Sequence, residues 1–114
     1  MLEGTWRAVG GRLGTESIPI PATCFVITGD TYVIETPAGI ERGCWVWLET
    51  EEPRVLRLTG TTGQHANQVI EALVRVRGSV MQLCYAVDGG PRPQDFADAE
   101  TRGAVVTMRY HRDD

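Results

Sequence analysis

The chain has 114 residues, of which 42% are hydrophobic and 23% charged, and its formal net charge is -4. This length is enough to bury one core and too short for two, so we expect a single domain over residues 1–114. Basic residues are scattered among acidic ones and form no basic stripe, which argues against a nucleic-acid partner.

Short runs of alternating apolar and polar residues follow one another, separated by glycine, proline and aspartate. Short strands between turn signals favour an antiparallel barrel or sandwich. In chain order the predicted strands cover residues 5–9, 23–28, 31–36, 40–49, 55–59, 68–77, 80–87 and 103–111. Gly29-Asp30 provides the positive φ of a tight hairpin, and Gly78-Ser79 marks another turn.

One of these segments also fits a helix. Val69, Ile70, Leu73 and Val74 recur at helical spacing. The second half of the segment alternates arginine with valine, and valine and isoleucine favour extended structure. We therefore predict a strand here.

Gly4-Thr5-Trp6 near the start, with a basic strand around Arg109 near the end, resembles the signature of calycins, the small up-and-down barrels of the lipocalin type. The run 83–86, the loop 89–93 and Asp95-Phe96 are similar to a bacterial lipocalin-like domain family first catalogued in planctomycetes, a family without an established activity. The resemblance implies an all-β fold: an eight-stranded antiparallel up-and-down β-barrel, lipocalin-like.

The resemblance also implies roles at one end of the barrel. Trp6 should plug that end, with an arginine of the last strand stacked on its ring. Arg109 is the expected partner, and Arg112 stays open because the register of the last strand is not fixed by the sequence. The loop with Arg92 and Asp95 is expected to clamp a barrel end or to form one rim of its mouth.

Strand alternation assigns one apolar set to the inside of the barrel. It comprises Phe25, Ile27, Tyr32, Ile34, Trp45, Trp47, Leu56, Leu58, Ile70, Ala72, Val74, Val76, Met81, Leu83 and Tyr85.

An eight-stranded barrel is just wide enough to be filled by side chains or to hold one small ligand. Four inward aromatic residues either fill this space or line a cup in which indole N–H and phenol O–H groups anchor a mainly apolar molecule. The predicted ligand-binding residues are Tyr32, Trp45, Trp47, Leu58, Val74, Met81, Leu83 and Tyr85.

The outward face of strands two to five carries an apolar set: Cys24, Val26, Val33, Cys44, Val46, Leu48 and Val55. Contiguous exposed apolar patches usually mark an interface. We therefore predict a homodimer or a bound partner on this face, formed by Val26, Val33, Cys44, Val46 and Leu48; isolated surface valines are the alternative.

Metal and cofactor signals are weak. His65 and His111 are not at metal-ligand spacing with another ligand residue, and a haem site would need one of them to reach the cup. The carboxylates are expected outside, in turns or near the termini, so no acid–base pair is predicted in the cup. Three widely spaced cysteines, Cys24, Cys44 and Cys84, are expected to be reduced. We expect no metal and no cofactor.

The amino terminus lacks a basic stretch followed by an apolar run, and no apolar segment is long enough to cross a bilayer. The expectation is a cytoplasmic protein that binds a small apolar molecule in the barrel cup. One alternative is a metal-free cyclase or isomerase of the natural-product type, which holds a flexible substrate in its reactive fold in the same cavity. Another is a protein-interaction module with a packed barrel.

Overall fold

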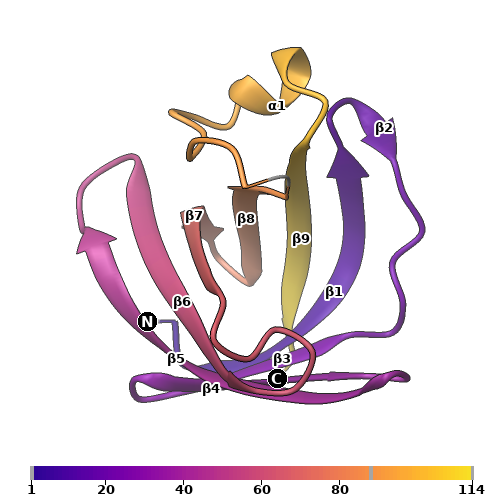
Figure 1. Cartoon of the computed structure of the whole chain (residues 1–114), viewed down its shortest axis with the longest axis vertical. Coiled ribbons are helices and arrows are strands. Elements are labelled where there is room, and N and C mark those ends of the chain that lie inside the picture. Colours follow the sequence, from indigo (N-terminus) through magenta and orange to yellow (C-terminus); the bar gives the residue numbers. More distant parts are fainter. Residues whose placement is uncertain (1, 88, 114) are drawn as a thin grey trace.

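A computed structural model describes residues 2–87 and 89–113. In these residues eight antiparallel strands form a barrel, which is closed because β1 pairs with both β3 and β9 (Figure 1). The short strand β2 pairs with the end of β1. This confirms the predicted all-β, eight-stranded antiparallel barrel. The elements are β1 Gly4–Leu13, β2 Glu16–Ser17, β3 Cys24–Thr28, β4 Thr31–Thr36, β5 Gly39–Glu49, β6 Arg54–Thr62, β7 Val69–Arg77, β8 Val80–Ala86, α1 Asp98–Thr101 and β9 Val105–Asp113.

The segment with the helical alternative is strand β7, as predicted. Strand β1 runs on past Val9 to Leu13, although Gly10 and Gly11 have low strand propensity. It continues because β9 pairs with it on both sides of a bulge between Ala8 and Gly10. The sequence prediction also missed β2 and the short helix α1.

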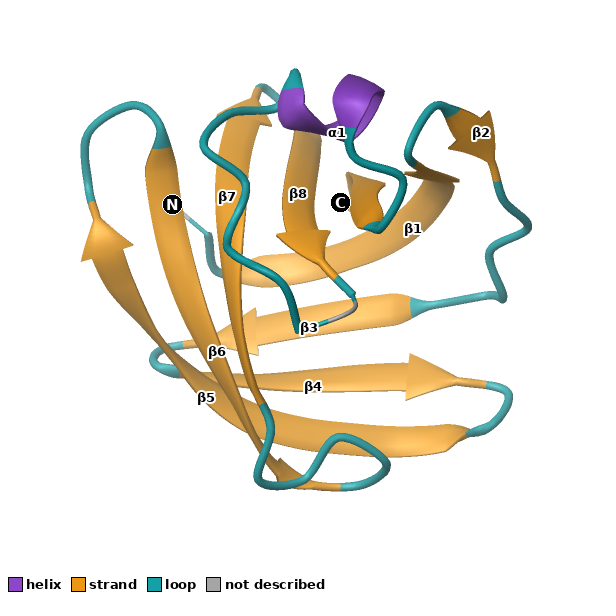
Figure 2. Ribbon diagram, turned by 45° about the horizontal axis from the view of Figure 1, so that its top comes forward, coloured by secondary structure: helices purple, strands orange, loops and turns teal. Residues whose placement is uncertain are grey.

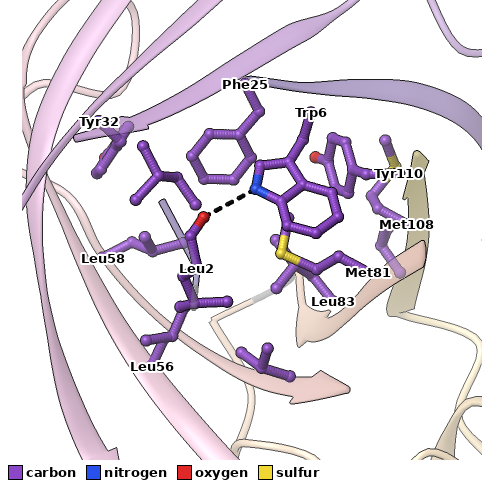
Figure 3. Close-up of a cluster of buried hydrophobic side chains, with 13 residues drawn as sticks. Leu2, Trp6, Phe25, Tyr32, Leu56, Leu58, Met81, Leu83, Met108 and Tyr110 are labelled. Atoms are coloured by element: carbon purple, nitrogen blue, oxygen red, sulfur yellow. Dashed lines mark hydrogen bonds between the residues drawn. The ribbon is translucent and has the colours of Figure 1, made fainter. Parts of the chain in front are cut away.

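The predicted inward face is the face that packs. The buried side chains inside the barrel form one cluster around Trp6, which we call the inner core. Every residue assigned to the inward face belongs to the inner core or packs against it, except Ala72, which is fully buried. Trp6 lies at the centre of the inner core and is 0% exposed, and its Nε1 donates a hydrogen bond to the carbonyl oxygen of Leu2 at 2.9 Å (Figure 3). The Phe25 ring meets the rings of Tyr32 and Tyr110 edge-on, each with centroids 5.6 Å apart.

The stacking partner of Trp6 is Arg112, and the prediction of Arg109 is wrong. Arg112 pairs directly with Trp6 in the β1–β9 register, and its Cζ lies 4.5 Å from the centre of the indole ring. Arg109 is an odd number of residues away, so alternation turns its side chain to the outer surface, where it is exposed.

We expect Arg112→Gln to lower the free energy of unfolding by about 0.5–2 kcal/mol, the range of a cation–π contact. Arg109→Gln removes the same charge from the same strand, and we expect a change within about 0.5 kcal/mol because its site is exposed. Urea denaturation followed by tryptophan fluorescence measures both. Equal losses for the two variants would contradict the assignment.

A second apolar cluster lies outside the barrel wall. Outward side chains of four neighbouring strands, β6 to β9, are covered by the segment that connects β8 to β9, which passes in front of β7 in Figure 2. Arg75 stacks on the ring of Phe96, with its Cζ 4.1 Å from the ring centre. The buried members are Val55, Leu73, Cys84, Ala99 and Val105, with Leu48 and Phe96 packed against them.

This outer cluster corrects two expectations. Val55 is 2% exposed, so it is not part of an open outward patch. Arg92 pairs with Glu71 on the outside of β7 at 3.0 Å, while Asp95 accepts a hydrogen bond from the backbone of Asp98. The loop therefore covers the wall, and its arginine and aspartate form no clamp at a barrel end.

The rest of the outward set is only partly open. Val46 is 52% exposed and Cys44 is exposed, whereas Val26 and Val33 are half-buried. The three cysteines are unpaired, and Cys84 is buried in the outer cluster. No helix among the described residues is long and apolar enough to span a membrane. The homodimer through this face stays a prediction.

Candidate functional site

The two ends of the barrel differ. At the end that holds Leu2 and the last residues of β9, Trp6 and Leu2 are buried and Arg112 covers the indole ring; we call it the closed end. Toward the opposite end, where the loops 14–23, 37–38 and 63–68 lie, several inner-wall side chains are partly exposed. We call this end the mouth; it holds Ile34, Ile70 and Tyr85, while Trp45 lies farther inside, with its backbone N–H bonded to the carbonyl of Asp30 in the hairpin at the closed end.

The predicted ligand-binding residues are thereby divided. The aliphatic ones are buried in the inner core, namely Leu58, Val74, Met81 and Leu83, and Tyr32 is 7% exposed. Tyr85 is at the mouth, and Trp45 is half-buried farther inside. Trp47 is also half-buried, but it lies nearer the closed end, with Arg54 over its ring and its own ring edge-on to Trp45.

Trp45 carries an unpaired donor. Its Nε1 is buried and has no hydrogen-bond partner among the described residues. Leaving a buried donor unsatisfied costs about 1–3 kcal/mol, so such a group in a native structure needs an explanation. Trp6 provides the contrast, because its Nε1 is bonded to Leu2.

Two buried or half-buried phenol groups of the inner wall, those of Tyr85 and Tyr110, are neutral. Burial raises the pKa of Tyr85, and burial followed by the proximity of Tyr85 raises the pKa of Tyr110. At neutral pH these groups are therefore hydrogen-bond donors and acceptors and are poorly suited to act as bases.

The mouth also holds a carboxylate, contrary to the expectation that all carboxylates face outward. Glu41 pairs with Ile34 in the β4–β5 register and shares the inner face of β5 with Trp45 and Trp47. The signal was present in the sequence, since Glu41 is separated from Trp45 and Trp47 by even numbers of residues. Extending the alternation to the start of β5 would have found it.

His65 does not lie free in a solvated loop. Its Nδ1 pairs with Oε1 of Glu41, and the two side chains are 49% and 21% exposed. The other histidine, His111, is on the outer side of β9, where its Nε2 lies 3.1 Å from the hydroxyl of Ser79. Of the two histidines, His65 is thus the one that the structure brings to the mouth.

The loop 63–68, at the bottom of Figure 2, folds back onto the end of β6. The backbone N–H of Gly60 donates to the carbonyl of Gln68 at 3.0 Å, and Asn67 donates to the carbonyl of Gly60 at 2.9 Å. A Cβ on Gly60 would overlap the carbonyl of His65. Glycine at position 60 therefore permits the close approach that brings His65 to Glu41.

Tyr32 connects Glu41 to the inner core. Its ring lies over Gly43, where an added Cβ would overlap the phenol end of the ring. Burial raises the pKa of Tyr32, and the negative charge of Glu41 raises it further. The phenol is therefore neutral and electrostatically coupled to Glu41.

Two grooves lie on the outside of the wall. One of about 730 Å³ separates the turn before β6 from the segment after β8, and its lining includes Glu49, Glu71 and Arg92. Another of about 570 Å³ lies along β1 and β9 and includes Arg12 and Arg109. Neither involves the inner-wall residues of the mouth.

No family model, no curated protein and no solved structure matches this chain. The resemblance to lipocalin-like domains stays an expectation.

Proposed function

We propose that the barrel binds a small, mainly apolar molecule at the mouth, with the indole N–H of Trp45 as its hydrogen-bonding anchor. The observation that carries this proposal is the buried, unpaired Nε1 of Trp45 on the inner wall. A ligand oxygen would satisfy this donor and remove the cost of leaving it unpaired.

The inner wall at the mouth supports an apolar ligand. Ile34, Ile70 and Tyr85 are inner-wall side chains that pack on the core but stay partly exposed. Burying apolar surface contributes about 25 cal/mol per Å², so covering these side chains favours binding. A few polar groups among apolar walls are the usual composition of a small-molecule site.

Native mass spectrometry of the freshly purified protein tests the proposal, beside the same sample after denaturing extraction. The expected result is an adduct near one-to-one, either co-purified or formed on adding methyl octanoate, an ester with one good acceptor and an apolar chain. An unliganded mass under both conditions would count against an accessible mouth.

We expect Trp45→Phe to weaken methyl octanoate binding about two- to twelvefold, because a hydrogen bond contributes about 0.5–1.5 kcal/mol net. Glu35→Gln is the control, since it changes an exposed side chain on the outer face of β4, and its affinity should stay within about twofold of the original protein. Isothermal titration calorimetry measures both. An unchanged affinity in Trp45→Phe would rule out the indole as anchor.

A further inference from the structure

A polar strip runs along the inner wall of β5. It consists of the Glu41 carboxylate, the Tyr32 phenol that covers Gly43, and the Trp45 indole N–H. Glu41 and Trp45 are four residues apart, which is about 13 Å along a strand. The strip therefore has an accepting group at its outer end and a donating group farther inside.

The outer end of the strip carries the Glu41 carboxylate. Among the described strands, the arginines at inner-wall positions are Arg54 and Arg112, which stack on Trp47 and Trp6 away from the mouth. Glu41 has no arginine partner within ion-pair distance in the described residues, and its partner is the half-exposed His65.

Glu41 retains accepting capacity. The hydrogen bond to His65 engages Oε1, and no partner of Oε2 is found among the described residues. A carboxylate offers about four acceptor positions, so one histidine N–H leaves several unfilled. The side chain is 21% exposed, which leaves it accessible at the rim while most of its surface is shielded from water.

We propose that Glu41 selects the polar end of the ligand. The site binds an elongated molecule that has an acceptor near Trp45 and an ammonium or hydroxyl group at Glu41. It disfavours a molecule with a carboxylate at Glu41. The cation or hydroxyl donates to the free oxygen of Glu41, forming a charge-assisted hydrogen bond. A carboxylate at the same place meets a like charge and has no proton to donate.

This inference rests on the proposed function, and the choice of probes separates the two. Four esters share the same ester acceptor and the same eight-carbon chain. Methyl octanoate ends in a methyl group, and the methyl ester of aminooctanoic acid ends in an ammonium group. The methyl ester of hydroxyoctanoic acid ends in a hydroxyl group, and the monomethyl ester of octanedioic acid ends in a carboxylate. Their affinities are measured by isothermal titration calorimetry at neutral pH and moderate salt.

We expect the ammonium ester to bind at least about tenfold more tightly than the carboxylate ester, with the affinity of the hydroxyl ester between them. The ammonium group forms a charge-assisted hydrogen bond with Glu41, whereas the carboxylate is repelled by it. In Glu41→Gln the ammonium and carboxylate esters should differ by less than about threefold, because the charge is gone while the side-chain shape remains. Methyl octanoate, which has no polar end, is the reference ligand against which the affinities of the charged esters are expressed in each protein.

Glu35→Gln is the matched control, because it removes one negative charge from an exposed position on neighbouring β4. It should retain the preference of the original protein. Two results would overturn the role of Glu41: equal affinities of the ammonium and carboxylate esters in the original protein, or an unchanged preference in Glu41→Gln. In either case the proposed function stands if methyl octanoate binds. If no ester binds, the proposed function fails and this inference fails with it.

Discussion

Trp6→Ala is expected to lower the free energy of unfolding by about 3–5 kcal/mol, the usual cost of removing a large buried aromatic side chain. Trp6 is 0% exposed at the centre of the inner core, and its loss also frees the Leu2 carbonyl and removes the surface on which Arg112 stacks. Since a domain of this size is stabilised by about 5–15 kcal/mol, much of the total would be lost.

Urea denaturation followed by far-ultraviolet circular dichroism measures this loss without relying on the removed fluorophore. Trp6→Phe is the control, because it keeps an aromatic ring in the core while losing the hydrogen bond to Leu2, and it should cost clearly less than the alanine variant. A loss below about 1 kcal/mol for Trp6→Ala would contradict the closed end as described.

Gly43→Ala is expected to cost about 1–3 kcal/mol through overpacking. A Cβ at this position would overlap the end of the Tyr32 ring and approach the backbone oxygen of Thr59, so the ring or the strand has to move. Because the Tyr32 phenol forms the middle of the polar strip, ligand affinity should fall together with stability.

Gly10→Ala is the matched control, since a Cβ at Gly10 meets no atom within 4 Å. It should change the free energy of unfolding by no more than about 0.5 kcal/mol. Thermal unfolding of both variants gives the comparison. Equal stability of Gly43→Ala and the original protein would mean that Tyr32 does not lie over Gly43.

The barrel could be predicted because its signal is local. Alternation identified the apolar inward residues of β3 to β8, including β7 with its helical alternative, and hairpin signals such as Gly29-Asp30 set the strand breaks. It left out Glu41 and the inward residues of β9. Gly29 indeed has a positive φ of 57°. What alternation cannot give is the register between distant strands, and without that register the sequence does not distinguish Arg112 from Arg109 as the partner of Trp6.

Most of the candidate site was within reach of the sequence. Alternation placed Trp45 and Tyr85 on the inner wall, and Glu41 would have followed from carrying the same period to the start of β5. His65 was out of reach, because its position depends on how the loop 63–68 folds onto Gly60. The outer cluster was missed for a related reason: the packing of the segment 89–104 on the wall depends on tertiary contacts that no short-range pattern encodes.

In the proposed complex, the indole N–H of Trp45 donates a hydrogen bond to the ligand. The most direct test is a ¹H–¹⁵N correlation spectrum of the three tryptophan indole groups during titration with methyl octanoate, with Trp45→Phe assigning the signal. We predict that the Trp45 signal moves downfield and saturates as it gains an acceptor, while the Trp6 signal stays in place because its N–H is already bonded to Leu2. A Trp45 signal that does not move at the highest soluble ligand concentration would contradict the account.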